Sequence, residues 1–164
     1  EEGLAQRAAE LGAAAMARLL RAGVALEQGK PADAARLYAE VAASSKAPPA
    51  LRDLAIVREV ATTYDTLKPE QVVARLKPLA APGNPYFGSA GEMVAMAYLE
   101  QGKRKEAGTL FAEIAKSEDA PDGLRSRARQ MAGLLGVDAI EDVNKVLEES
   151  RVDGESAAPL PAGE

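Results

Sequence analysis

The residues that could carry chemistry in this 164-residue chain are few and poorly placed for it. Histidine and cysteine are both absent, which excludes imidazole acid–base catalysis, thiolate nucleophiles and zinc sites built on these ligands. Acidic pairs occur, such as Glu141 with Asp142 and Glu148 with Glu149. Adjacent residues of a helix point in different directions, so we interpret both pairs as solvated helix surface rather than a catalytic dyad.

The hydroxyl and glycine-rich candidates lead to the same interpretation. Ser44, Ser45 and Ser117 fall near expected helix ends, with no histidine to act as their base. The segment GNPYFG, residues 83–88, lacks the Lys and Ser/Thr that end a phosphate-binding loop. We therefore predict a protein that is not an enzyme, with no catalytic residue, no cofactor and no metal site.

Composition narrows the class of partner. The net charge is −5, from 20 basic and 25 acidic residues, which disfavours nucleic acid and anionic lipid surfaces. Aromatic residues make up 4% of the chain and alanine is abundant, a mixture that suits closely packed helices better than sheets. No stretch reaches the roughly 18 consecutive apolar residues of a membrane helix.

The elements that position these side chains are organised by an internal repeat. LEQGKPADAARLYAEVAASSKAPPALR, residues 26–52, aligns without gaps with LEQGKRKEAGTLFAEIAKSEDAPDGLR, residues 99–125, and 15 of the 27 pairs are identical. The offset of 73 is about twice the 34-residue period of paired-helix repeats, which predicts a middle copy. PEQVVARLKPLAA, from Pro69, supplies it, with Val72, Leu76 and Leu79 at the matching apolar positions.

Each unit is predicted to be a pair of helices. Gly29 and Gly102 end the first helices, where positive φ is required. Apolar residues then recur at helical spacing in the second helices: Ala34, Leu37, Tyr38 and Val41, and Ala107, Leu110, Phe111 and Ile114. The expected helices are 3–28, 31–45, 49–65, 69–80, 86–101, 104–117, 121–135 and 138–149. We expect one domain over 1–150 and a disordered tail over 151–164.

The turn glycine, the small alanine five residues later, the aromatic residue four further on and the following proline resemble the tetratricopeptide repeat. The resemblance covers Ala15 to Leu135 and departs from the pattern where Arg21-Ala22 and Val94-Ala95 replace the usual Leu-Gly. It implies an all-α superhelix of about three helical-hairpin repeats, closed by a capping helix pair. Such stacks form a long concave surface, lined by the first helix of each unit, that binds peptides or partner helices.

Candidate partner-binding residues lie on the expected first helices. They are Met96, Leu99 and Glu100 in the third unit and their approximate counterparts Leu19, Leu26 and Glu27 in the first. The paired glutamates would favour a basic partner. Methionine and leucine at this spacing are also typical of a buried core, and that alternative stays open here.

Three longer segments are similar to the YfgM-type family, ancillary subunits of the bacterial Sec translocon. They are LYAEVAASSKAPPALRDLA, NPYFGSAGEMVAMAYLEQGK and AGTLFAEIAKSEDAPDGLRSRARQM. The resemblance implies a periplasmic domain at the inner membrane, with an anchor expected before Glu1, that contacts the translocon and periplasmic chaperones in export or envelope-protein folding. The alternative is a soluble repeat scaffold or assembly factor in another compartment such as the cytoplasm, which self-associates.

Overall fold

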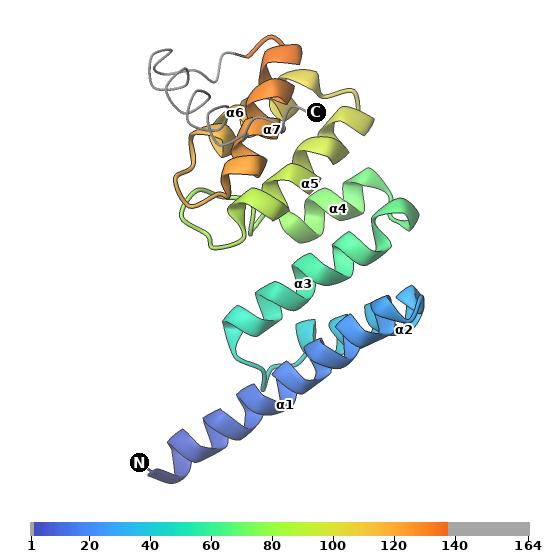
Figure 1. The fold of residues 1–164 in the computed structure, drawn as a ribbon, viewed down its shortest axis with the longest axis vertical. Coiled ribbons are helices and arrows are strands. Elements are labelled where there is room, and N and C mark those ends of the chain that lie inside the picture. Colours follow the sequence, from blue (N-terminus) through green and yellow to red (C-terminus); the bar gives the residue numbers. More distant parts are fainter. Residues whose placement is uncertain (1, 138–164) are drawn as a thin grey trace, which may run out of the picture.

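The structure of the protein is a computed structural model that describes residues 2–137, and every regular element in this range is helical (Figure 1). The helices are α1 (Glu2–Glu27), α2 (Pro31–Ala42), α3 (Pro49–Thr63), a 3-10 turn η1 (Tyr64–Thr66), α4 (Pro69–Leu76), α5 (Phe87–Glu100), α6 (Arg104–Lys116) and α7 (Asp122–Leu134). The all-α class and the helices expected over this range are confirmed. The helix expected at 138–149 and the tail at 151–164 lie outside the described residues.

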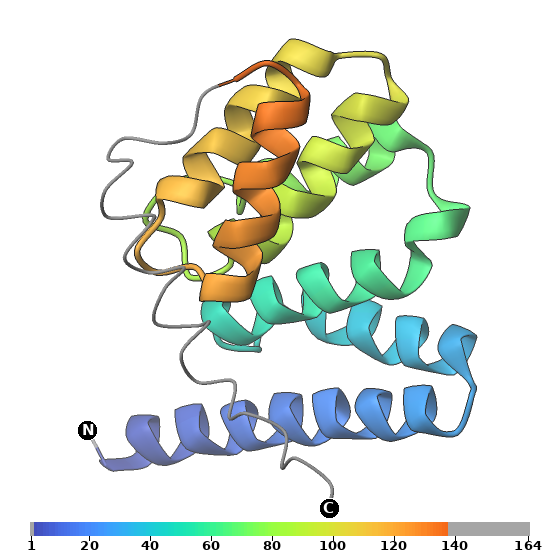
Figure 2. The same ribbon diagram turned by 45° about the horizontal axis from the view of Figure 1, so that its top comes forward.

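Each helix packs against the next along the chain, so the molecule is a stack that runs from α1 to α7 (Figures 1 and 2). The most extensive contacts are within the pairs α1–α2 and α5–α6 and between each pair and the helix that follows it. The two copies of the sequence repeat therefore occupy the same structural unit. Residues 26–52 and 99–125 each run from the end of a first helix, through a second helix, into the helix after it.

The two copies make the same turn between their helices. Gly29 has φ 70° and Gly102 has φ 73°, a conformation that glycine adopts without steric cost. The Lys30 amide donates to the Ala25 carbonyl at 2.8 Å, and the Lys103 amide donates to Tyr98 at 2.8 Å. This bond across six residues is the Schellman closure of a helix end. The predicted glycine turns are confirmed.

The predicted apolar stripes form the core of the second helices. All eight residues at these positions in α2 and α6 are buried, and so are Val72, Leu76 and Leu79 of the middle copy. The helix of that copy, α4, ends at Leu76 rather than at residue 80 as expected. Pro78 explains the early end, because proline lacks the amide proton and its ring clashes with the preceding helical turn.

Polar contacts align the successive first helices in parallel. The Tyr86 hydroxyl donates to the Ala50 carbonyl at 3.2 Å, which joins the starts of α5 and α3. The Tyr64 hydroxyl donates to Glu100 at 2.8 Å, which joins their ends. Both pairs are separated by 36 residues, and the Arg127–Glu92 ion pair between α7 and α5 by 35. The stack thus repeats at about 36 residues per helix pair.

The buried residues form two clusters that meet at α3. The lower cluster joins α1 and α2, and Ala55 of α3 belongs to it. The upper cluster joins α4, α5, α6 and α7, and Val57 and Val60 of α3 belong to it. Helix α3 therefore couples the two halves of the stack, and the upper half has the larger core.

Candidate functional site

The three candidate residues on α1 lie in different surroundings. Leu19 is 7% exposed and packs in the lower cluster, so it belongs to the core and not to an exposed surface. Leu26 is 38% exposed near the end of the helix, and the neighbouring Glu27 is also exposed. Of this group, Leu26 and Glu27 are accessible to a partner.

The three candidates on α5 also differ. Met96 is 41% exposed, whereas Leu99 is half-buried against the upper cluster. Glu100 is exposed, and its carboxylate accepts the hydrogen bond from the Tyr64 hydroxyl. The glutamate at the equivalent position in the first unit, Glu27, accepts no hydrogen bond from the described residues. Glu100 therefore has a structural contact that the sequence repeat did not indicate.

The structure does not bring the two groups of candidates into contact. Helix α3 lies between α1 and α5, packing on both (Figure 1). A partner that touched Leu26 and Met96 together would have to cross α3. The exposed residues of α3 include Arg58 and Ala61. The sequence did not indicate them as candidates, because only the first turn of α3 falls within the aligned repeat.

A hydrogen bond and partial burial together shift the pKa of the tyrosine at the α3–α5 junction. Burial of the Tyr64 phenol, together with its hydrogen bond to Glu100, raises the pKa of Tyr64 well above its ordinary value near 10. The phenol is therefore held in its neutral, hydrogen-bond-donating form. Tyr64 follows the last residue of α3, and its hydrogen bond to Glu100 links α3 to α5. We therefore assign it a structural role rather than a reactive one.

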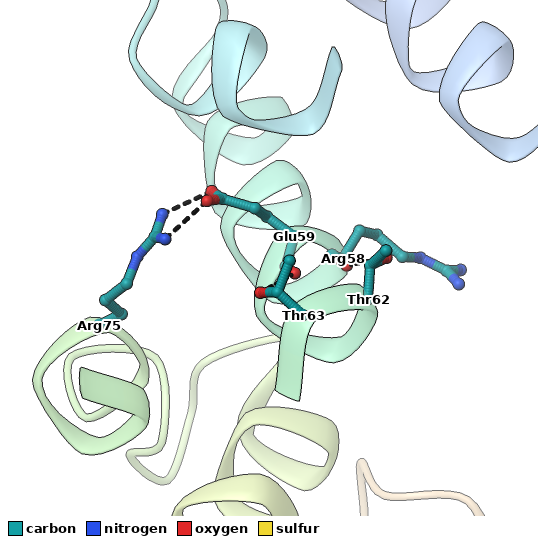
Figure 3. Close-up of polar contacts among 5 residues, drawn as sticks. All are labelled: Arg58, Glu59, Thr62, Thr63 and Arg75. Carbon is teal, nitrogen blue, oxygen red and sulfur yellow. Dashed lines mark hydrogen bonds and ion pairs between the residues drawn. The ribbon is translucent and has the colours of Figure 1, made fainter. Parts of the chain in front are cut away.

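An ion pair links α3 to α4, the second helix of the same pair. The Arg75 guanidinium donates to both carboxylate oxygens of Glu59, at 2.7 and 2.5 Å, in the bidentate geometry that Figure 3 shows. This hydrogen bonding raises the pKa of Arg75 further, so the pair stays charged. The Glu59 side chain is only 13% exposed. Beside it, the Thr62 and Thr63 hydroxyls donate back to the Arg58 and Glu59 carbonyls and end the helix.

Two clefts of the described surface lie away from the candidate residues. One of about 410 Å³ opens between the end of α4, α5 and α6. It has apolar walls that include Tyr98 and Leu110, and charges of both signs: Lys77, Lys105, Glu106 and Glu113. Another of about 440 Å³ lies between α2, α3 and α4 beside the Glu59–Arg75 pair. None of the six candidates lines either cleft, and periodicity gave no signal for them because it marks buried positions only.

A third cleft, of about 440 Å³, opens between α1 and α2. Its apolar lining includes Leu11, Ala14, Val41 and Ala47, and Arg18 and Lys46 are among its polar residues. The Arg18 Nε atom lies 3.8 Å from a Glu40 carboxylate oxygen, so that one of the two basic groups is paired. The sequence did not predict this cleft either.

The candidates for metal binding and catalysis that the sequence offered can be placed only in part. Residues 2–137 contain no cluster of acidic, histidine or cysteine side chains that could hold a metal ion, and no buried charged residue. Ser44 and Ser117 lie at the ends of α2 and α6. The acidic pairs at 141–142 and 148–149 fall outside the described residues. Among the described helices, none is long and apolar enough to cross a membrane.

Comparison of the chain with protein-family models, with curated proteins and with solved structures gave no match. The class that the structure defines is accordingly an all-α protein of packed, repeat-like helical pairs.

Proposed function

We propose that this chain is a protein-binding domain of the tetratricopeptide-repeat type, which recognises a segment of a partner protein. The observation that supports it most is the register of α3, α5 and α7, whose linking contacts are 36, 36 and 35 residues apart in sequence. Helices stacked in this way present one continuous series of side chains to a partner. Leu26 and Met96 are the exposed apolar members of the predicted face.

The binding step would be passive. A preformed surface gains free energy by burying apolar side chains, at about 25 cal/mol per Å², and charges at its rim select the partner. Exposed Glu27 and Glu100 give this rim an acidic character at two repeated positions. A segment with an apolar centre and basic flanks is therefore the partner chemistry that we propose.

The setting that we propose is the periplasmic face of the bacterial inner membrane, where the domain assists Sec-dependent export or envelope-protein folding. This part rests on the similarity of residues 37–55, 84–103 and 107–131 to the YfgM-type family. The runner-up is a repeat scaffold or assembly factor in another compartment, such as the cytoplasm. Membrane fractionation of the natural gene product separates the two, since only the first predicts recovery with inner membranes.

In-cell photo-crosslinking tests the binding face. A photoreactive residue replaces Met96 or Leu26 in the natural gene product, and adducts are identified by mass spectrometry. Thr109, which lines the α4–α5–α6 cleft, is the matched exposed position on another surface. Adducts with translocon subunits, envelope chaperones or exported proteins at Met96 and not at Thr109 would support the proposal. Adducts only with a second copy would favour the self-associating scaffold.

A charge substitution tests the same face by affinity. We expect Met96→Glu to weaken partner binding about tenfold or more, because it places a desolvated carboxylate against the apolar segment of the partner. Thr109→Glu is the matched control and should leave binding unchanged. Circular dichroism should show the same helicity for both variants. Undiminished binding by Met96→Glu would eliminate this face.

A further inference from the structure

The two related helical pairs differ at one internal corner. In the pair α5–α6, Phe87 is 3% exposed at the start of α5. A Cβ atom built on Gly91 would lie 3.5 Å from the Phe87 ring and 3.0 Å from Ile114. The aromatic ring and Ile114 therefore meet over Gly91 and fill the corner between the two helices.

The pair α1–α2 has the same corner without the ring. The offset of 73 places Ala14, Arg18 and Val41 at the positions of Phe87, Gly91 and Ile114. All three line the 440 Å³ cleft between α1 and α2. By this offset, the cleft lies at the corner where Phe87 packs in the related pair, with alanine in place of the phenylalanine. In place of Gly91, the stem of Arg18 supplies an apolar wall that ends in a cation, a surface suited to the face of an aromatic ring.

Charged side chains surround the mouth of this cleft. Lys46 lines it, is exposed, and makes no ion pair with the described residues. Asp119 stands at the equivalent position of the other pair. Arg18 and Lys46 against Glu40 leave one net positive charge around the opening. A carboxylate next to the entering side chain would therefore be favoured over a second cation.

We propose that the α1–α2 cleft binds a phenylalanine or tyrosine side chain of a partner protein, with a carboxylate beside it in the partner segment. The inference rests on the proposed protein-binding function but uses a surface separate from Leu26 and Met96. Apolar burial of the ring supplies the affinity, as it does for Phe87 within the chain. Lys46 supplies the preference for the neighbouring carboxylate.

The aromatic side chains of this sequence pack within its own fold. The sequence has four tyrosines and two phenylalanines, and all six lie in the described part. Tyr38, Phe87 and Phe111 are buried, and Tyr64, Tyr86 and Tyr98 pack against the upper cluster. Residues 138–164 contain no aromatic residue. We therefore assign the aromatic occupant to a partner protein rather than to these six side chains.

The test is a nuclear magnetic resonance titration of the methyl-labelled full chain with three small probes. N-acetylphenylalanine should shift the methyl resonances of Ala14, Val41 and Ala47 with a dissociation constant in the millimolar range, as expected for a ligand of this size. N-acetylphenylalaninamide should bind about threefold more weakly, because it lacks the carboxylate. N-acetylalanine should cause no shift. Lys46→Ala should remove the difference between the first two probes.

Two variants that fill the cleft keep the test decisive. Ala14→Phe should supply the ring from within the chain and weaken probe binding at least tenfold, and Ala14→Leu should do so in part. Ala17→Phe adds the same ring to an exposed position of α1 that does not line the cleft, and it should leave binding unchanged. Absence of methyl shifts at about 20 mM probe, or equal shifts in Ala14→Phe, would overturn the proposal.

The outcome is independent of the cross-linking at Met96. Partner adducts at Met96 without probe binding in the cleft would leave the protein-binding proposal standing and remove this one. Probe binding without adducts at Met96 would support aromatic binding in the cleft. It would also indicate that the partner does not bind the face formed by the first helices.

Discussion

The helical pairs α1–α2 and α5–α6 share a sequence repeat and a turn, yet their first helices are covered differently. Ala90, Val94 and Ala97 of α5 are at most 1% exposed, because α4 packs against that side of the helix. The equivalent residues of α1 are Ala17, Arg21 and Val24, all exposed. Helix α1 packs on its successors α2 and α3. The repeat specifies the pair, and the neighbouring helix decides which further residues become core.

Helix α1 lies at the end of the stack, and only some of its solvent-facing residues are polar. Arginine at position 21, where α5 has valine, is what a solvated face requires. Leu20 and Val24 are still apolar, at 65% and 50% exposed. The sequences of the two copies thus differ most outside the buried apolar stripe that α2 and α6 share. Four experiments, taken from the largest expected effect to the smallest, test this comparison.

The largest contrast is expected from one substitution made at two equivalent positions. Ala97→Glu buries a carboxylate in the upper cluster and should cost more than about 4 kcal/mol of unfolding free energy, or prevent folding. Val24→Glu places the same group on the open side of α1 and should change stability by less than about 0.5 kcal/mol. Urea denaturation followed by circular dichroism measures both. A large loss in Val24→Glu would mean that something covers this side of α1 in solution.

The next effect concerns the bidentate Glu59–Arg75 pair between α3 and α4. Arg75→Leu leaves the Glu59 carboxylate, at 13% exposed, without its partner and should destabilise the protein by about 2–3 kcal/mol. Arg75→Leu combined with Glu59→Leu removes both charges and should recover most of this loss. Arg36, exposed in a surface pair with Glu40, is the matched control. Arg36→Leu should cost less than about 0.5 kcal/mol. Thermal unfolding of the wild type and the three variants decides the point, and no recovery in the double variant would contradict it.

The shared turn should give equal effects in the two copies. Gly29→Ala and Gly102→Ala each force a side chain into positive φ, and each should cost about 1 kcal/mol. No other atom lies within 4 Å of an added Cβ at either position, so the cost is conformational. Gly23→Ala, within α1 and also free of close neighbours, is the control and should be neutral or stabilising. Unequal losses in the denaturation of the two turn variants would mean that the copies do not close their helices alike.

The sequence predicted the helices, the glycine turns and the buried stripes because these depend on local spacing and on backbone conformation. Ala34 and Ala107, for example, are both fully buried, as their place in the stripe required. It left the burial of Leu19 as an open alternative, and it did not predict the Tyr64–Glu100 bond or the α1–α2 cleft. Each of these depends on which residues from distant helices meet, and a repeat offset does not reveal a side chain that one copy lacks. The partner-binding role of the six candidates stays a prediction.

The smallest expected effect separates the equivalent glutamates at the ends of α1 and α5. Only Glu100 accepts a hydrogen bond from a tyrosine, and Tyr64→Phe should cost about 0.5–1 kcal/mol at pH 7 through loss of that bond. The folded-state pKa of Tyr64 is raised, so this stabilisation is fully present below the unfolded pKa near 10 and is lost as pH rises above it. The difference between wild type and Tyr64→Phe should therefore shrink from pH 9 to pH 11.

Paired denaturation curves at these two pH values measure the shrinkage, which solvent screening of the half-buried phenol limits to less than about 1 kcal/mol. Tyr98→Phe is the matched control, since the Tyr98 hydroxyl makes no hydrogen bond with the described residues. Glu27→Gln and Glu100→Gln complete the comparison. Only Glu100→Gln should reproduce part of the Tyr64→Phe loss, because it replaces a charged acceptor with a neutral one. Equal losses from the two glutamine variants would mean that the tyrosine bond does not distinguish the ends of α1 and α5.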